Sequence, residues 1–209
     1  MKRILIADDH SVVRNGLKQI LEDEFIGVEF GEAKNSAEAL RKAGEKKWDI
    51  LILDINMPGR SGLEVLHQLK EEKSSLPVLV FSMYAEEQIA VRTIKSGAWG
   101  YISKDAADTE LVKAIHQILN GKKYISARVA ELLAEQIENP SDKAPHELLS
   151  DREYETFILI AKGKTVSEIA EELSLATPTI STFRARILEK MNLKNSAELV
   201  KYAMDNKLV

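Results

Sequence analysis

The sequence contains no cysteine and no long uninterrupted run of apolar residues. The missing thiols exclude disulfides, thiolate nucleophiles and cysteine-bound zinc, so nothing indicates an oxidising compartment. The first apolar stretch ends at Asp8, too early for a signal peptide, and no stretch approaches the roughly 18 residues that a membrane span needs. We therefore expect a cytoplasmic protein without membrane contacts.

Charge of neither sign dominates the chain. The formal net charge of −4 by itself argues against binding to nucleic acid. This average hides an asymmetry, because residues 175–209 carry six Lys and Arg against three Asp and Glu. With 44% hydrophobic and 30% charged residues the composition is that of a folded protein, and 209 residues suit one large or two small domains.

The first part of the chain alternates short apolar runs with amphipathic stretches. This pattern is typical of strands joined by helical crossovers, and it predicts a doubly wound, five-stranded parallel sheet of the α/β class. Asp108 is a predicted helix start, and Gly97 and Gly121 stand where helix ends are expected. The predicted strands are residues 4–7, 28–33, 50–54, 78–81 and 101–103, and the predicted helices are 12–22, 36–46, 62–70, 86–96 and 108–119.

The pattern changes after residue 122. An amphipathic stretch, 127–137, is followed by a polar segment with Pro140 and Pro145, the best linker candidate in the chain. The remainder shows no strand pattern and predicts four short helices, at 151–161, 166–173, 177–191 and 196–206. We expect an α/β domain at 1–122, a linker helix and flexible linker at 123–146, and a small all-α domain at 147–209.

Polar side chains follow the predicted strands of the first domain. Asp8 and Asp9 end the first strand, Asp54 the third and Ser82 the fourth, and Lys104 comes just after the fifth. Ligands of such sheets bind at the carboxyl ends of the strands, where these groups meet. Converging carboxylates need a cation, and all-oxygen ligands favour Mg²⁺. One carboxylate can then act as a nucleophile towards phosphorus, with the lysine and hydroxyl supporting the phosphoryl group.

These residues resemble the receiver domain of bacterial two-component response regulators. The resemblance rests on Asp8-Asp9, Asp54 with Asn56-Met57-Pro58-Gly59 and Gly62, Ser82, and Tyr101 three residues before Lys104. It implies that Asp54 accepts the phosphoryl group and that Asp8, Asp9, Asp54 and the Asn56 carbonyl bind the metal. It also implies that Ser82 and Lys104 bind the phosphate and that Tyr101 is a switch that swings inward. One departure is Asp105, where many receivers have a proline that follows a cis bond.

Simpler interpretations stay open for several of these residues. Asp9 or Asp54 can cap a following helix or loop, and a tyrosine such as Tyr101 in a final strand is more often part of the core. His10 is expected only to flank the acidic site. The remaining histidines lack metal-ligand spacing, and we expect them on the surface; they are His67, His116 and His146.

Residues 166–191 show two helical periods separated by a short turn. Their apolar positions predict two helices that cross on a shared core, as in a helix-turn-helix. Thr177 is the predicted N-cap of the second helix, and Pro178 suits its first turn. That helix presents polar and basic residues, and its shape fits the major groove of DNA.

This segment resembles the LuxR-type helix-turn-helix. The resemblance rests on residues 149–153, 160–163, 169–170, 179–180 and 190–192. A receiver joined to this module defines the NarL/FixJ branch of response regulators. The residues expected to contact DNA are Thr179, Ser181, Thr182, Arg184, Ala185, Arg186 and Lys190, with a solvated helix face as the alternative for Arg184 and Arg186. The last helix is expected either to complete the core or to pair two copies.

The combined pattern predicts a regulator of transcription and not an enzyme. A sensor histidine kinase would phosphorylate Asp54 in the presence of Mg²⁺, and the chain would then bind promoter DNA, as a homodimer when phosphorylated or DNA-bound. One alternative is a Mg²⁺-dependent phosphohydrolase, although Asn56 stands where such enzymes usually have an acid. Another is a DNA-binding protein whose receiver mediates contacts without phosphorylation.

Overall fold

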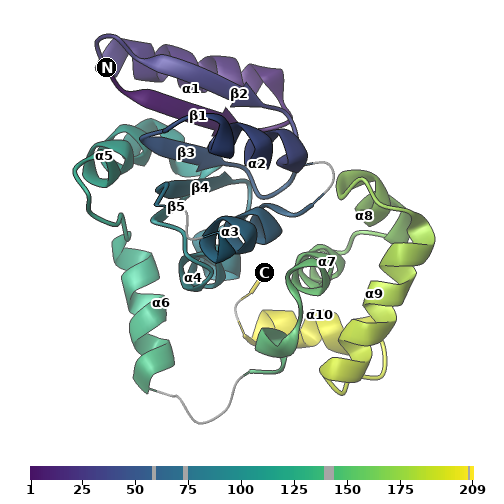
Figure 1. The fold of residues 1–209 in the computed structure, drawn as a ribbon. Helices are drawn as coiled ribbons and strands as arrows, with labels where there is room; N and C mark the ends of the chain where they lie inside the picture. Colours follow the sequence, from purple (N-terminus) through teal and green to yellow (C-terminus); the bar gives the residue numbers. More distant parts are fainter. Residues whose placement is uncertain (58–59, 73–74, 139–143, 207) are drawn as a thin grey trace. The chain divides into compact units, whose positions relative to one another are not determined.

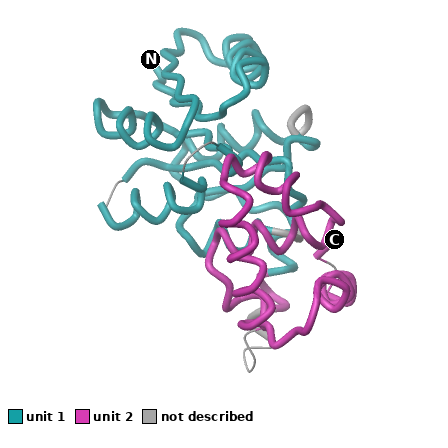
Figure 2. Tube along the Cα trace, turned by 90° about the vertical axis from the view of Figure 1, so that its right-hand side faces the viewer, with its two compact units in different colours: residues 1–132 teal, residues 133–209 magenta. Residues whose placement is uncertain are grey.

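The computed structural model describes residues 1–57, 60–72, 75–138, 144–206 and 208–209. The chain forms two compact units, residues 1–132 and residues 133–209 (Figure 2). Pro58 and Gly59 of the acidic-site pattern and residues 139–143 of the predicted linker lie outside the described residues. The domain boundaries at 122 and 146 stay predictions.

The first unit contains a five-stranded sheet in which every pairing is parallel, as the alternating pattern predicts (Figure 1). The strand order is β2-β1-β3-β4-β5, so the α/β fold class is confirmed and the order is that of flavodoxin-like folds. In this order the chain reverses direction across the sheet between β1 and β3, the place where ligands of such sheets bind. The strands are β1 (Arg3–Ala7), β2 (Glu29–Ala33), β3 (Ile50–Leu53), β4 (Val78–Ser82) and β5 (Gly100–Ser103).

Helices cover both faces of the sheet, which is why the central strand β3 is apolar and buried at every position. On one face Ile4 and Ile6 share a core with Leu17 of α1 and Leu111 and Ile115 of α5. The helices α2, α3 and α4 cover the other face (Figure 1). The helices of this unit are α1 (Ser11–Glu24), α2 (Ser36–Glu45), α3 (Gly62–Glu71), α4 (Glu86–Lys95) and α5 (Ala107–Leu119), with a 3₁₀ turn η1 (Lys104–Ala106) before α5.

The second unit is helical. Its central helix α7 contacts α8, α9 and α10, and the apolar residues Phe157, Ile169, Ile180 and Leu199 are fully buried. None of the described helices is long and apolar enough to cross a membrane. The elements are η2 (Pro145–Leu148), α7 (Asp151–Ala161), α8 (Val166–Glu172), α9 (Thr177–Lys190) and α10 (Ser196–Asp205); α6 (Ala127–Glu138) precedes them.

Helix termini account for most differences from the predicted boundaries. Thr177 is the first residue of α9 and not its N-cap, because the extended residue before the helix is Ala176. Asp108 lies inside α5, which follows η1 and begins at Ala107. The two predicted glycine ends are confirmed: Gly97 and Gly121 follow α4 and α5 with φ of 112° and 77°, a region that favours glycine.

Candidate functional site

The carboxyl ends of β1 and β3 bring Asp8 and Asp54 side by side. The strands pair in register up to Ala7 and Leu53, and the next residue on each strand is an aspartate. The Asp54 N–H donates to the Ala7 carbonyl at 2.8 Å, which continues the ladder by one bond. Both side chains are buried, with residue exposures of 1% and 3%. Two carboxylates so placed repel one another unless a cation lies between them.

Lys104 supplies a cation at this point. Its Nζ lies 2.7 Å from Asp8 Oδ2 and 2.7 Å from Asp54 Oδ2. Lys104 begins η1 directly after β5, so the ammonium comes from the same edge of the sheet as both aspartates. The departure at Asp105 does not disturb this placement, and peptide bonds are trans throughout the described residues.

The other oxygen of each carboxylate accepts a hydrogen bond from the backbone two residues later. Asp8 Oδ1 accepts from His10 N–H at 2.8 Å, and Asp54 Oδ1 accepts from Asn56 N–H at 3.1 Å. Such local bonds fix the side-chain directions of aspartates in loops. Both carboxylates are therefore held between the backbone of their own loop and Lys104.

The acidic group extends beyond this pair. Ligand atoms of Asp8, Asp9, His10 and Asp54 all lie within 4.8 Å of one another. Carboxylate oxygens with open positions for water suit Mg²⁺, which uses one or two carboxylates and keeps several waters. The residues therefore fit the ion, with Asp8, Asp9 and Asp54 as the oxygen donors. His10 lies beside the carboxylates, with its Nδ1 2.8 Å from Asp9 Oδ1, and that it only flanks the site stays a prediction.

The electrostatics of the site reflect one lysine shared among several carboxylates. Burial raises the pKa of Asp54, and Lys104 opposes this while Asp8 adds to it. Burial alone would lower the pKa of Lys104, but the carboxylates of Asp54 and Asp8 raise it overall. The surroundings thus favour the charged form of Lys104. They disfavour the charged form of Asp54, so ionised Asp54 costs folding free energy.

Gly62 permits the close approach of α3 to the loop after β3. A Cβ at this position would lie 2.7 Å from the Asp54 carbonyl oxygen and 2.6 Å from Ile55 Cα, so no other residue fits without moving the backbone. Ser61 and Glu64 cap the helix reciprocally and fix its start. Gly62 was part of the pattern that resembles receiver domains, but the sequence did not show that this glycine packs against the backbone of Asp54 and Ile55.

Ser82 and Tyr101 are both linked to the backbone of Tyr84. The Tyr84 N–H donates to Ser82 Oγ at 3.4 Å, and the Tyr101 hydroxyl donates to the Tyr84 carbonyl at 2.5 Å. Ser82 is fully buried and Tyr101 is 1% exposed, so the ring already points inward. This placement also fits the simpler interpretation of Tyr101 as a core residue.

The second unit places a turn between α8 and α9. Leu173 and Ile180 are buried on either side of it, and Ser174 has a φ of 54°. Five of the residues predicted to contact DNA are exposed on α9: Ser181, Thr182, Ala185, Arg186 and Lys190. Thr179 is half-buried. The exposed face of α9 is the candidate nucleic-acid interface.

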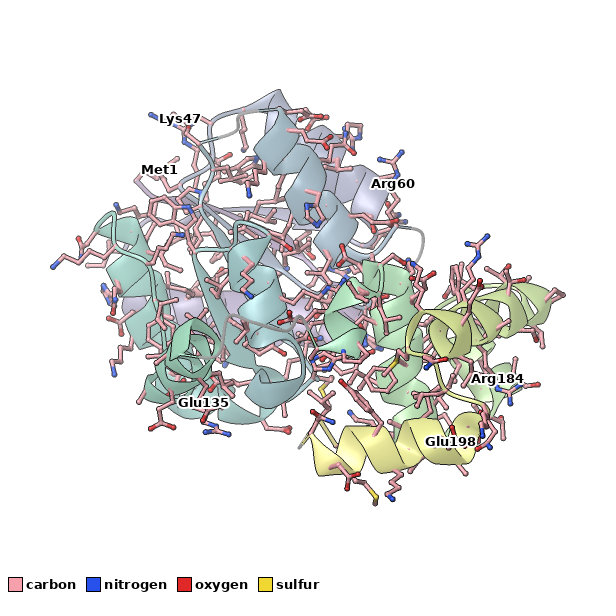
Figure 3. All side chains as sticks on the ribbon, turned by 90° about the horizontal axis from the view of Figure 1, so that it is seen from below. Met1, Lys47, Arg60, Glu135, Arg184 and Glu198 are labelled. Carbon is pink, nitrogen blue, oxygen red and sulfur yellow. The ribbon has the colours of Figure 1, made fainter. Side chains whose placement is uncertain are left out.

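Arg184 and Lys190 are engaged inside the unit. Arg184 Nε donates to Ser196 Oγ at 2.8 Å, which joins α9 to the start of α10, where Glu198 also lies (Figure 3). Lys190 Nζ lies 2.6 Å from Glu153 Oε2, and Glu153 is buried at the start of α7. These contacts give both cations a structural part beside the predicted contact with DNA.

The histidines outside the acidic site follow the prediction in two cases of three. His67 and His116 are exposed. His146 is half-buried, and its Nδ1 lies 2.8 Å from the Tyr202 hydroxyl, with the ring 6.1 Å from that of Tyr154. The prediction of a surface position is therefore wrong for His146, because η2 folds this residue onto α7 and α10.

One residue near the acidic site is not identifiable from the sequence pattern. Arg14 lies on α1, and its Nη1 donates to the backbone carbonyls of Asp8 and Asp9. A cation about one helical turn after an acidic loop was the only available signal. Many surface arginines share that spacing, so the contact required the fold.

Comparison with known proteins agrees with both halves of this description. Residues 4–116 match the response regulator receiver domain, and residues 147–203 match the bacterial regulatory proteins of the luxR family. The response regulator UvrY of Escherichia coli K12 is 33% identical over 206 residues, covering 98% of this chain and 94% of UvrY. The response regulator GacA of Pseudomonas viridiflava is 34% identical over 211 residues, covering 100% of this chain and 98% of GacA.

Among solved structures, RcsB from Salmonella enterica serovar Typhimurium bound to the rprA promoter with a phosphomimetic matches with a TM-score of 0.65 and 25% identity. The match covers 98% of this chain and 99% of that one. A receiver domain and a luxR-family module thus occur together in this chain, and its relatives match over nearly their whole length. The chain belongs to the NarL/FixJ family of two-component response regulators, which regulate transcription.

Proposed function

We propose that this response regulator is phosphorylated on Asp54 by a sensor histidine kinase in the presence of Mg²⁺, and that phosphorylation switches promoter binding. The observation that carries the proposal is the Lys104 ammonium 2.7 Å from both Asp8 and Asp54, on a chain that also has a LuxR-type module. The protein would act in the cytoplasm, where a regulator meets promoter DNA.

The chemistry follows from the residues around Asp54. A carboxylate oxygen of Asp54 attacks phosphorus, the bond from phosphorus to the donor breaks, and an acyl phosphate forms. The phosphoryl oxygens carry spreading negative charge, which the Lys104 ammonium stabilises and the Ser82 hydroxyl supports by donating a hydrogen bond. Mg²⁺, when bound by Asp8, Asp9, Asp54 and the Asn56 carbonyl, would neutralise more of this charge. Asn56 offers no ionisable proton, so a phosphohydrolase would lack its general acid.

The route from the phosphate to the rest of the receiver passes through Tyr84. Ser82 and Tyr101 each bond to the backbone of this one residue. When Ser82 turns to the phosphate, its bond to the Tyr84 N–H weakens, and the Tyr84 carbonyl that holds Tyr101 moves with it. Phosphorylation would therefore act on the hydrogen bond that holds the Tyr101 ring inward. Because the ring already points inward, the predicted switch consists of keeping or leaving this position.

The DNA-binding surface would be the exposed face of α9. Ser181, Thr182 and Ala185 are exposed and would contact bases, and Arg186 offers a cation for a phosphate or a guanine. Thr179, Arg184 and Lys190 would contribute at the edges of this surface. RcsB is described as bound to promoters and, in one structure, as two dimers on two parallel DNAs. We extend both properties, DNA binding and dimer formation, to this chain.

Phosphorylation is tested with acetyl phosphate and Mg²⁺. Intact mass spectrometry should show an adduct of roughly 80 Da on the wild type, the mass of one phosphoryl group on a carboxylate nucleophile. Asp54→Ala should abolish the adduct, whereas the exposed Asp23→Ala should keep it. An adduct that survives in Asp54→Ala would overturn the assignment of the acceptor.

Asp54→Asn is expected to stabilise the metal-free protein at neutral pH. Because burial raises the pKa of Asp54, the folded state takes up a proton at higher pH than the unfolded state. The resulting penalty is absent well below the ordinary pKa of 3.8, grows as the pH rises through it, and is complete above the raised pKa.

Urea unfolding with a chelator at acidic and neutral pH measures this penalty. The gain in free energy of unfolding should appear only at the higher pH, and the exposed Asp23→Asn should show none. A wild type as stable as Asp54→Asn at neutral pH is the contrary outcome.

Arg186→Ala should weaken binding to duplex DNA by about 1–3 kcal/mol while leaving the unfolding curve unchanged, because the side chain is exposed. Fluorescence anisotropy at several salt concentrations measures the loss, and a lower salt slope identifies a phosphate contact. Lys201→Ala removes an exposed cation from α10 and serves as the control. Equal losses in the two variants would contradict a specific role for α9.

A further inference from the structure

Arg14 connects α1 to the loop that carries Asp8 and Asp9. Its Nη1 donates to the Asp8 carbonyl at 2.8 Å and lies 3.3 Å from the Asp9 carbonyl. These carbonyls follow the end of β1 and precede α1, so they lie beyond the hydrogen-bonded ladder of the sheet. One guanidinium nitrogen therefore holds the backbone of both acidic residues at once.

The guanidinium is itself held from the other side. Arg14 Nε donates to Glu32 Oε2 at 2.9 Å, and Lys18 Nζ lies 2.7 Å from Glu32 Oε1. Hydrogen bonds from Lys18 and Arg14 lower the pKa of Glu32, so this carboxylate stays ionised. The Arg14 side chain is 14% exposed, which leaves it little freedom to move. The edge strand β2 thus fixes Arg14, and Arg14 fixes the loop.

This arrangement differs from an ordinary surface ion pair. An exposed pair such as Arg41 with Glu45 adds little to the stability of a protein. Arg14 instead uses its planar fork, with Nε on Glu32 and Nη1 on the two carbonyls. A lysine at this position has its donors on one nitrogen and lacks the planar fork, so it matches the two sets of partners less well.

We propose that Arg14 is a positioning residue that holds the Asp8 and Asp9 carboxylates in the geometry needed for the divalent ion, and that Glu32 orients Arg14 for this task. The proposal rests on the proposed function, since it concerns the same acidic site. The carboxylates would contact the ion, whereas Arg14 bonds to the backbone carbonyls and would act through them. Groups that orient metal ligands from outside typically change metal affinity about 10–100-fold when removed.

The test is metal binding by the full chain. Mn²⁺ serves as a paramagnetic probe, with free Mn²⁺ followed by electron paramagnetic resonance and Mg²⁺ added as competitor. Arg14→Gln should weaken binding about 10–100-fold. Arg14→Lys keeps the charge but not the fork, so it should restore only a small part of the loss. Lys18→Gln is the control, because it removes a cation from the same network without touching the loop, and should change affinity by less than about twofold.

Phosphorylation by acetyl phosphate gives a second readout. In Arg14→Gln the Mg²⁺ concentration for half-maximal rate should rise as the Mn²⁺ affinity falls, while the rate at saturating Mg²⁺ should approach that of the wild type. A general loss of structure would lower the saturated rate as well. Circular dichroism shows whether each variant is folded. If Arg14→Gln is unfolded, the metal affinity and the Mg²⁺ dependence are measured on Arg14→Lys instead.

The outcomes separate this proposal from the proposed function. Wild-type affinity in folded Arg14→Gln, or an equal loss in Lys18→Gln, overturns the role of Arg14 and leaves the metal site standing. A wild type that binds neither Mn²⁺ nor Mg²⁺ and yields no adduct overturns the proposed function itself.

Discussion

The shared ion pair of Lys104 with Asp8 and Asp54 is the interaction on which the site depends. It joins the ends of β1 and β3 to the residue after β5, so it requires the strand order of a parallel sheet with its switch between β1 and β3. The pair is buried, and a buried lysine that loses its carboxylates, or carboxylates that lose their lysine, would leave uncompensated charge. The sheet, the loops and the charges are therefore mutually dependent.

The same pair makes the site responsive. One ammonium cannot neutralise three aspartates, and burial already raises the pKa of Asp54. A divalent ion, and then a phosphoryl group, alters this balance strongly, because charges interact more strongly at buried positions than in water. Ser82 and Tyr101 meet at the Tyr84 backbone close to this site, so a local change of charge has a connected set of hydrogen bonds through which to act.

Much of this was predictable from the sequence, for identifiable reasons. The alternation of apolar runs and amphipathic stretches predicted the parallel sheet. The polar residues after the strands predicted that Asp8, Asp54 and Lys104 lie together, because the carboxyl ends of parallel strands share an edge. The helix-turn-helix followed from the apolar period around Ile169 and Ile180.

Other features required three-dimensional proximity. Arg14 contacts carbonyls, which no residue pattern encodes. Gly62 is needed for an approach to the Asp54 backbone, and Arg184 and Lys190 turned out to have partners at Ser196 and Glu153 that lie far along the chain. His146 was assigned to the surface because it lacks metal-ligand spacing, which says nothing of its contacts with the rings of Tyr154 and Tyr202.

The charge state of the Asp54 site is expected to control DNA binding by the same chain. The most direct measurement is the affinity of the full chain for a duplex selected from a random-sequence pool, before and after phosphorylation, at one salt concentration. Phosphorylation should change the affinity of the wild type and leave that of Asp54→Asn unchanged. Equal affinities before and after a complete phosphorylation reaction would contradict it, and would favour a DNA-binding protein whose receiver mediates contacts alone.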